Sequence, residues 1–432
     1  MKQLVMVELN ELNFELIQSY IQAGENLPAF SNLIDSGIIH TYAEKKYELL
    51  EPWIQWVSVH TGKEFTDHSV FRLGDIIDCP AQQIFEKIES RGYKVGVFGA
   101  MNTDNRMKAP AYFVPDPWTQ TPSDESLESR FLVDALRQVV NDNSSGHIAF
   151  TSALKFLYVG VRCLKPRTLL GLSISALKSF HKPWLRAIFL DEFLAKVHLS
   201  YFRRLQPHFS TVFFNAGAHV QHHYMHNSIV CNDISSKNPS WYCAASYDPV
   251  LDCLRVYDRI LAEIMETPDI DYLIATGLTQ KPYLRPMFYY RPRNHKEFFK
   301  SILNDECKVI PRMTRDSLLV FESEDQAVRC EKILRNTFIK DEALFGEVDR
   351  RGNELFVVLT YDREISPGDV AVSPNGHIDI FPQVVFVALK NGAHDTNGYA
   401  VASHGLRSLL LQSDTVHVSE LNHVIDEYFA VA

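Results

Sequence analysis

The sequence predicts an α/β protein with a mostly parallel central sheet and helices on both faces. Short apolar runs, typical of buried strands, alternate with helix-like segments over much of the chain. Polar residues follow directly after several of these runs, at the carboxyl ends of the expected strands. Open α/β sheets place their sites at that edge. A parallel sheet with a site at its carboxyl edge is therefore expected.

The first expected elements cover the N-terminal hundred residues. Residues 3–8 form an apolar strand, and 12–22 and 27–37 have helical patterns, with Pro28 near the start of the second. A helix-like segment at 81–91 then precedes another buried strand at 94–99. The alternation of strand and helix favours parallel pairing of these strands.

The second half of the core repeats this order. Strands are expected at 209–215 and 272–276, each after a helix. The helix 249–266 has a continuous apolar face, which comprises Val250, Leu251, Leu254, Tyr257, Leu261 and Ile264.

Two insertions divide the core in this prediction. The core comprises 1–119, 206–284 and 371–432, with a helical insertion or cap over 120–205 and a small α+β insertion over 285–370. The α+β insertion has a strand at 317–321, a helix at 324–337 and a hairpin at 343–361. The chain then returns to the core through 384–389 and ends in a helix at 418–430.

The helical insertion is apolar and basic. It could act as a lid over the sheet edge, or make peripheral membrane contact through 150–205, as basic amphipathic helices do. The alternative is an insertion that packs on the core, which is favoured because no strict polar–apolar face is apparent.

Composition excludes several classes of function. The net charge of −10 and the lack of a basic block near the histidine cluster argue against nucleic-acid binding. Seven scattered cysteines without a CxxC pair indicate neither a disulfide framework nor a zinc ribbon, and favour the reducing cytoplasm. The N-terminal segment is too quickly acidic for a signal peptide, and no apolar run predicts a transmembrane helix.

A histidine cluster follows the strand at 209–215. His219, His222, His223 and His226 have the spacing i, i+3, i+4 and i+7, which would place them on one helical face. Imidazoles at the carboxyl end of a strand suit metal binding or proton transfer. The alternative is a solvated or core-satisfied cluster.

Four stretches, in this order, resemble the alkaline phosphatase superfamily, in particular its type I phosphodiesterase and nucleotide pyrophosphatase branch. They are 4–11, 51–62 with Asp67 and His68 behind it, 213–226, and 392–398. They are similar to the family's first metal-binding strand, its nucleophile segment, its Asp-x-x-x-His motif and its late metal-binding His segment. The resemblance implies an alkaline phosphatase-like fold and a metal-dependent reaction at a phosphoester.

The chain departs from the family pattern at several ligands. Asn10 stands where the resemblance implies an Asp, Pro52 near the place of the nucleophile, and Ala218 in place of the Asp that pairs with His222. Residues 275–278, Ala-Thr-Gly-Leu, replace a Ser-Asp-His-Gly segment. Only His222 and His394 carry over, so the family's two-metal clamp cannot be assembled.

The remaining residues predict a rebuilt site with one divalent ion. Histidines with a carboxylate suit zinc, manganese or iron better than magnesium or calcium. The predicted ligands are Glu8, Asn10, His219, His222 and His394.

Three residues are predicted to take part in catalysis. Glu51 could act as base, nucleophile or ligand, or serve only as a helix N-terminal carboxylate before Pro52. Asn215 and Thr276 could position substrate, or cap the turns that follow them. Ser58 is a poor nucleophile candidate, because it lies inside the expected helix.

The leading hypothesis is a metal-dependent hydrolase, phosphodiesterase-like, or transferase acting on a phosphoester or related anionic ester. The substrate would be a small molecule or an anionic glycan or lipid-linked compound. Two alternatives stay open: a non-catalytic pseudoenzyme or binding protein that kept the fold, and a transferase of lipid-linked or polysaccharide metabolism.

Overall fold

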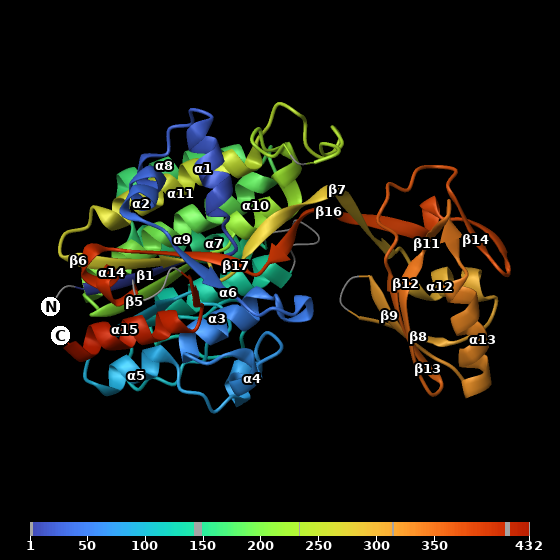
Figure 1. Cartoon of the computed structure of the whole chain (residues 1–432), viewed down its shortest axis with the longest axis horizontal. Helices are drawn as coiled ribbons and strands as arrows, with labels where there is room; N and C mark the ends of the chain where they lie inside the picture. The colour runs from blue at the N-terminus through green and yellow to red at the C-terminus, as the bar shows by residue number, and fades with distance from the viewer. Residues whose placement is uncertain (1–2, 142–148, 233, 313–314, 411–414, 432) are drawn as a thin grey trace. The chain divides into compact units, whose positions relative to one another are not determined.

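The computed structural model describes residues 3–141, 149–232, 234–312, 315–410 and 415–431 (Figure 1). Two compact units divide the chain. The larger comprises Met1–Pro282 and Gly392–Ala432, and the smaller comprises Tyr283–Asn391. The predicted site residues all belong to the larger unit.

An eight-stranded sheet forms the centre of the larger unit, in the order β18-β2-β17-β6-β1-β5-β3-β4. Its strands are β1 (Gln3–Leu9), β2 (Ile39–Tyr42), β3 (Val95–Phe98), β4 (Tyr112–Val114), β5 (Phe209–Phe214), β6 (Ile270–Ala275), β17 (Asn397–Ala402) and β18 (Thr415–His417). Among the described strands of this sheet, only β17 runs antiparallel to its neighbours. The predicted mostly parallel α/β fold is therefore confirmed.

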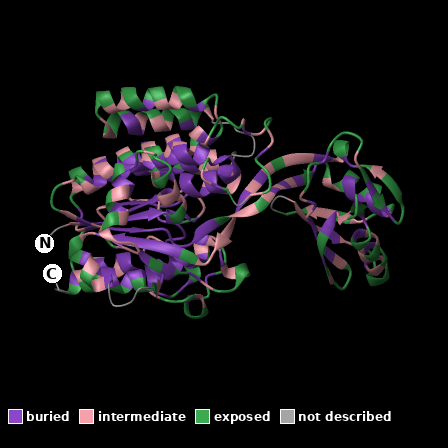
Figure 2. Cartoon of the chain, turned by 45° about the horizontal axis from the view of Figure 1, so that its top comes forward, coloured by how far each residue is buried: buried purple, intermediate pink, exposed green. Residues whose placement is uncertain are grey.

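Helices cover both faces of this sheet, and Figure 2 shows most of its strands buried, among them β1, β3, β4 and β5. Alternate side chains of β1 separate the two cores, because successive residues of a strand point to opposite faces. Val5 and Val7 pack with one layer of helices, and Leu4 and Met6 with the other. The first layer includes α1 (Phe14–Gln22), α2 (Pro28–Ser36), α9 (Trp184–Leu205), α10 (Ala216–Tyr224) and α11 (Pro249–Met265). The second includes α3 (Pro52–Thr61), α5 (Ile84–Ser90), α14 (His404–Leu410) and α15 (Glu420–Val431).

Strand register brings the site loops together. Leu9 of β1 pairs with Phe214 of β5, and Glu8 pairs with Ala275 of β6. Because the three strands are parallel and end at the same level, the residues after them meet at one edge.

The predicted helical insertion, 120–205, contains α6 (Leu127–Asn141), α7 (Phe150–Cys163), α8 (Pro166–Ser179) and all of α9. A short helix, α4 (Phe65–His68), follows α3. Within the described residues, no helix is both long and apolar enough to cross a bilayer.

The smaller unit extends beyond the predicted 285–370. Two four-stranded sheets, β12-β13-β9-β8 and β11-β10-β14-β15, form it together with two helices. Residues 371–391, which the sequence analysis assigned to the core, belong to this unit because β14 pairs with β10. Likewise, 384–389 does not enter the central sheet but lies in β16, which pairs with β7. These elements are β7 (Thr279–Pro292), α12 (His295–Leu303), β8 (Lys308–Pro311), β9 (Asp316–Val320), α13 (Glu324–Arg335), β10 (Phe338–Ile339), β11 (Glu342–Ala343), β12 (Phe345–Arg351), β13 (Glu354–Leu359), β14 (Val370–Ser373), β15 (Gly376–Asp379) and β16 (Val384–Asp395).

Candidate metal centre

Glu11 occupies the turn directly after β1, with a left-handed backbone. Its φ is +59°, a conformation that non-glycine residues seldom adopt and that often marks functional sites. Its N–H donates to the Thr276 carbonyl at 3.0 Å, and its own carbonyl accepts from Gln221 Nε2 at 2.8 Å. These bonds hold the Glu11 backbone at the carboxyl edge of the sheet.

Two histidines meet the buried carboxylate of Glu11. Glu11 Oε2 lies 3.0 Å from His222 Nε2 and 3.2 Å from His394 Nε2. The two Nε2 atoms are themselves 3.2 Å apart. The three side chains come from the loop after β1, from α10 and from the end of β16, and so converge from distant parts of the sequence.

The other ring nitrogen of His222 fixes its tautomer. His222 Nδ1 lies 3.1 Å from the carbonyl oxygen of Gly392, which can only accept a hydrogen bond. Nδ1 therefore carries a proton, and in the neutral ring Nε2 presents a lone pair to Glu11 and His394. A carbonyl behind a histidine in this way is the usual support of a metal ligand.

Electrostatics tie the three groups together. Burial disfavours the charged form of Glu11, but His222 and His394 outweigh burial and hold the pKa of the carboxyl well below its ordinary value. Burial lowers the pKa of His394, whereas Glu11 and then Glu51 raise it, and the net pKa lies above the ordinary value. The cluster therefore favours a positive charge between its ring nitrogens.

Neutral side chains hold the carboxylate in place. Asn10 Nδ2 donates to Glu11 Oε1 at 3.1 Å, and Gln280 Nε2 donates to Glu11 Oε2 at 2.5 Å. Trp56 Nε1 in turn donates to Asn10 Oδ1 at 2.7 Å. The groups next to Glu11 are thus the amides of Asn10 and Gln280, whereas a second ion would need further carboxylates there.

The triangle of ligand atoms fits one small divalent ion. Glu11, His222 and His394 each offer one atom, and these atoms lie within 4.8 Å of one another. In a tetrahedral site with bonds of about 2.0–2.1 Å, neighbouring ligand atoms lie about 3.3 Å apart. The separations of 3.0, 3.2 and 3.2 Å are close to that value. Three protein ligands also leave a fourth position for substrate.

Glu8 does not join this group, although it was a predicted ligand. It is fully buried, and its Oε1 accepts from His60 Nε2 at 3.1 Å and from the Thr211 hydroxyl. The reason is strand alternation, which turns Glu8 to the sheet face of Leu4 and Met6.

Asn10, another predicted ligand, lies at the site, but its side-chain oxygen already accepts a hydrogen bond. Its Oδ1 is already the acceptor for Trp56, and its Nδ2 bridges Glu11 and Asn215. Its place is therefore beside the carboxylate that binds the histidines, as a support rather than a ligand.

The histidine cluster separates into different roles. His219, His222 and His223 lie on α10, whereas His226 lies in the 3₁₀ turn Met225–Asn227 and faces the carbonyl of Ser236 at 3.0 Å. The expected single helical face of four histidines is therefore wrong, because α10 ends at Tyr224. The ring of His219 lies beside that of His223, with centroids 4.8 Å apart and the planes tilted by 58°, and His219 is not one of the three residues Glu11, His222 and His394.

The three predicted catalytic residues differ in how close they lie to the cluster of Glu11, His222 and His394. Glu51 occupies the N-cap position of α3 without a capping hydrogen bond from its side chain, and its Oε2 lies 3.8 Å from His394 Nδ1. Asn215 Oδ1 accepts from Asn10 at 2.8 Å, one step behind Glu11. Thr276 is fully buried, and its hydroxyl accepts from the Tyr399 N–H at 2.9 Å, so it serves the sheet.

Ser58 is buried inside α3, as the sequence analysis expected for a poor nucleophile. His68 Nε2 lies 3.1 Å from Ser58 Oγ, while His68 Nδ1 accepts from the Val70 N–H at 3.0 Å. Nε2 must then carry the proton and donate to Ser58, so His68 cannot take the serine proton. Burial also lowers the pKa of His68 to about 4.

Sequence reasoning missed two residues of the site, Glu11 and Gln280. Glu11 is adjacent to Asn10, and an acidic residue just after a buried strand was the available signal. Gln280 lies in a segment without a recognisable pattern, and only the fold brings it to Glu11.

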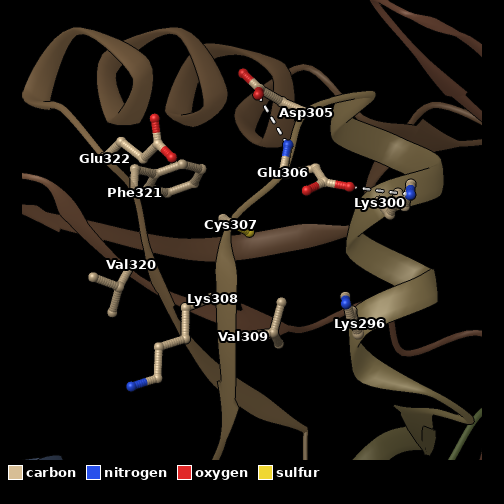
Figure 3. Close-up of a pocket in the computed structure, with 10 residues that line it drawn as sticks. All are labelled: Lys296, Lys300, Asp305, Glu306, Cys307, Lys308, Val309, Val320, Phe321 and Glu322. Carbon is tan, nitrogen blue, oxygen red and sulfur yellow. Dashed lines mark hydrogen bonds and ion pairs between the residues drawn. The ribbon is translucent and has the colours of Figure 1, made fainter.

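A separate hollow lies in the smaller unit, between α12 and strands β8 and β9 (Figure 3). Its charged side chains include Lys300 and Glu306, which pair at 3.3 Å on the exposed surface. Because exposed ion pairs of this kind are common and weak, the hollow is not assigned a function.

Comparison with known proteins adds structural likeness only. No protein-family model matches the chain, and no curated protein matches it. Similar solved structures include phosphonoacetate hydrolase from Sinorhizobium meliloti in complex with phosphonoformate, with a TM-score of 0.42 and 12% identity over 99% of this chain and 96% of that chain. They also include murine and human ectonucleotide pyrophosphatase/phosphodiesterase 5, each with a TM-score of 0.40, 8% and 9% identity, and coverage of 100% of this chain and 95% of theirs.

A likeness at this level transfers no activity, substrate or metal to this chain. The chemistry of the site therefore depends on its own residues.

Proposed function

We propose that this protein is a metal-dependent hydrolase or transferase of a phosphoester or related anionic ester, with one ion held by Glu11, His222 and His394. The observation that carries the proposal is the convergence of a buried carboxylate and two imidazole nitrogens at 3.0–3.2 Å. Two nitrogens and one oxygen suit zinc, manganese or iron.

The ion, when bound, would polarise an ester oxygen and stabilise the charge that develops on it. The protein's own residues supply position and proton transfer. Asn10 and Gln280 orient Glu11, and the Gly392 carbonyl orients His222. Glu51 is the carboxylate at the edge of the group that is partly open to solvent, 34% exposed, and we assign to it the transfer of a proton to or from the substrate.

The reaction class comes from the order of the four motifs, which resembles the alkaline phosphatase superfamily. The substrate class stays broad: a small molecule, or an anionic glycan or lipid-linked compound. With one ion in place of two, a single phosphoryl or ester oxygen can be bound at the fourth metal position.

Hydrolysis of bis(p-nitrophenyl) phosphate by the full chain tests this function. The protein is assayed with zinc, manganese and iron(II) in turn, as wild type, as Glu51→Gln and as the double variant His222→Ala/His394→Ala. We expect metal-dependent turnover in the wild type, a kcat lower by about 10²–10⁴-fold for Glu51→Gln, and none above background for the double variant.

The matched control is His219→Ala/His223→Ala, which removes two histidines from the same helix outside the ligand triangle. It should keep most of the wild-type rate. Equal loss in both double variants would show that the triangle has no special role, and a wild-type rate unaffected by chelation would exclude the metal mechanism.

A non-catalytic binding protein is the second candidate. Asn10 and Thr276 favour it. They stand in segments where the resemblance implies carboxylate ligands, but both side chains are neutral and already hydrogen-bonded within the protein. Tight metal binding, without turnover of the phosphodiester or of p-nitrophenyl mono- and carboxylic esters, would support this candidate.

A further inference from the structure

Helix α7 exposes a stripe of large apolar side chains. The residues of this stripe, Phe150, Leu154, Leu157 and Val161, are separated by four, three and four positions. That spacing places them on one helical face. Each is between 48% and 77% exposed, while Val159 and Gly160 are buried against the protein. The stripe is therefore not used by the core.

Helix α8 repeats the pattern. Leu170, Ile174 and Leu177 are separated by four and three positions, and Phe180 follows at the end of the helix. All four are at least half exposed, while Leu172 is buried. Two neighbouring helices thus each keep an apolar face exposed, which soluble proteins seldom do without a partner for that surface. The sequences of these helices have no strict polar–apolar face, because apolar residues occur on both the buried and the exposed sides.

The charge of this region is opposite to that of the whole chain. Residues 150–190 contain seven lysines and arginines and no acidic residue, in a chain with a net charge of −10. Lys155 and Arg162 pair with acidic residues of α6 at 3.0 and 3.2 Å. The other basic residues flank the ends of α8 and the start of α9, and they are Lys165, Arg167, Lys178, Lys182 and Arg186.

Apolar stripes flanked by positive charge match an anionic lipid surface. Amphipathic helices of this kind lie in the interface, with apolar side chains among the acyl chains and basic side chains at the headgroups. A second copy of the chain would bring the same unbalanced positive charges together, which disfavours self-association through this face. A nucleic acid would leave the apolar stripes exposed. None of the described helices can span the bilayer, so the contact would be interfacial.

We propose that α7 and α8 form a docking face for an anionic membrane surface, with Leu157, Leu170 and Leu177 inserted and Lys165, Arg167 and Lys178 at the headgroups. This inference does not depend on the metal centre. It concerns a different part of the larger unit and a different class of ligand.

Co-sedimentation of the full chain with vesicles tests the proposal. Vesicles of phosphatidylcholine alone are compared with vesicles that also contain phosphatidylglycerol. The wild type should bind the second kind, and less as salt rises, because salt screens the charges. The triple variant Lys165→Gln/Arg167→Gln/Lys178→Gln should lower the partition coefficient by about a hundredfold, since each basic residue near the surface contributes about fivefold.

The apolar contribution is tested with Leu157→Ser/Leu170→Ser/Leu177→Ser. These side chains are 60–67% exposed, so the fold does not need them. We expect this variant to bind the vesicles that contain phosphatidylglycerol about a hundredfold or more less tightly than the wild type does.

Matched controls carry the same chemical changes elsewhere. Lys45→Gln/Lys46→Gln/Lys63→Gln removes three exposed charges, and Ile77→Ser/Ile229→Ser/Leu284→Ser removes three exposed apolar side chains. Both should bind as the wild type does, and so should His222→Ala/His394→Ala, whose defect is confined to the metal centre.

Three results would overturn the proposal. The first is failure of the wild type to bind phosphatidylglycerol vesicles, and the second is an equal loss of binding in the variants and their controls. The third is a dimer, measured by light scattering, that the triple serine variant converts to a monomer, because the face would then be covered by a second copy.

Discussion

Glu11, in the turn after β1, has a left-handed backbone conformation, and this turn determines which of two glutamates contacts the histidines of the site. Glu8 and Glu11 are three residues apart, yet Glu8 lies beside His60 in the core and Glu11 lies between His222 and His394. The sequence contains both carboxylates but does not state the φ of +59° that turns the second one toward the histidines. Composition and spacing could therefore predict a carboxylate with two histidines, but not which carboxylate.

Glu11→Gln should remove most metal affinity while it keeps the shape of the side chain. The negative charge and one ligand oxygen are lost, and residues that only support a ligand already contribute about 10–100-fold to metal affinity. Titration calorimetry with zinc should show a Kd at least about a hundredfold weaker than for the wild type. Glu8→Gln is the control, and a similar loss there would contradict the assignment of Glu11.

At the scale of elements, Asp191 of α9 positions the start of α10. Its Oδ2 accepts from the N–H groups of Asn215 and Ala216 and from the Tyr257 hydroxyl, at 2.9, 2.7 and 2.6 Å. Burial raises the pKa of Asp191 to about 6, although these hydrogen bonds oppose it. The helix that carries His222 therefore begins at a carboxyl that titrates in a mildly acidic range.

The contribution of Asp191 to the free energy of unfolding, measured as the difference between the wild type and Asp191→Asn, should fall as pH rises from about 4 to about 6, because the unfolded chain releases the Asp191 proton first, near pH 4. Two pKa units correspond to about 2–3 kcal/mol, and the slope should vanish above pH 6, where both states are ionised. Chemical unfolding of the wild type and Asp191→Asn across this range measures it. The variant, which keeps one acceptor oxygen, should lack this slope, whereas exposed Asp134→Asn should retain it; identical profiles for Asp191→Asn and wild type would refute the prediction.

Gly392 permits the close approach of β16 to Gln280. A Cβ at Gly392 would lie 2.1 Å from Gln280 Oε1 and 3.1 Å from the Gln221 carbonyl. Gly392→Ala should therefore displace Gln280 from Glu11, with a loss of about 1–3 kcal/mol in stability and of about 10–100-fold in metal affinity. Urea unfolding and zinc titration measure both. Gly171→Ala, which meets no atom within 4 Å, is the control and should show neither loss.

The elements themselves were predictable where periodicity was strong. The strands β1, β3, β5 and β6 and the helix α11 lie within a few residues of their expected ranges. The exposed stripes of α7 and α8 were not recognised, since their outward leucines alternate with inward ones and a sequence does not say which apolar side is covered. His226 was misplaced because nothing in the local pattern marked the end of α10 at Tyr224.

At the scale of the whole molecule, all five tryptophans lie in the larger unit, at positions 53, 56, 118, 184 and 241. Tryptophan fluorescence thus reports unfolding of the unit that contains the metal centre, and Trp56 lies one hydrogen bond from Asn10. Saturation with zinc at about one hundred times its Kd should stabilise this unit by about 2.7 kcal/mol, because the ion binds only the folded site.

The measurement is thermal unfolding followed by tryptophan fluorescence, with zinc and with chelator. The midpoint should rise with zinc in the wild type and stay constant in His222→Ala/His394→Ala. An equal rise in both proteins would place the stabilising ion elsewhere.

The sequence predicted the fold class of the core correctly, but it did not predict the boundary between the two units. A parallel core with a small insertion follows from the alternation of strands and helices. The insertion ends at 391 rather than 370, because β14 and β15 complete a sheet with β10 and β11, a long-range pairing that no local pattern records. The place of Gln280 beside Glu11 was not predicted either, because it too depends on a contact between residues far apart in the sequence.

The metal content of the purified full chain tests the central claim most directly. Protein loaded with zinc, manganese or iron(II) and freed of excess ion by gel filtration is analysed by elemental mass spectrometry, beside His222→Ala/His394→Ala and His219→Ala/His223→Ala. We predict one ion per chain in the wild type and in His219→Ala/His223→Ala, and none in His222→Ala/His394→Ala. Retention of the ion by His222→Ala/His394→Ala, or its absence from the wild type under every loading condition, would contradict a metal centre at Glu11, His222 and His394.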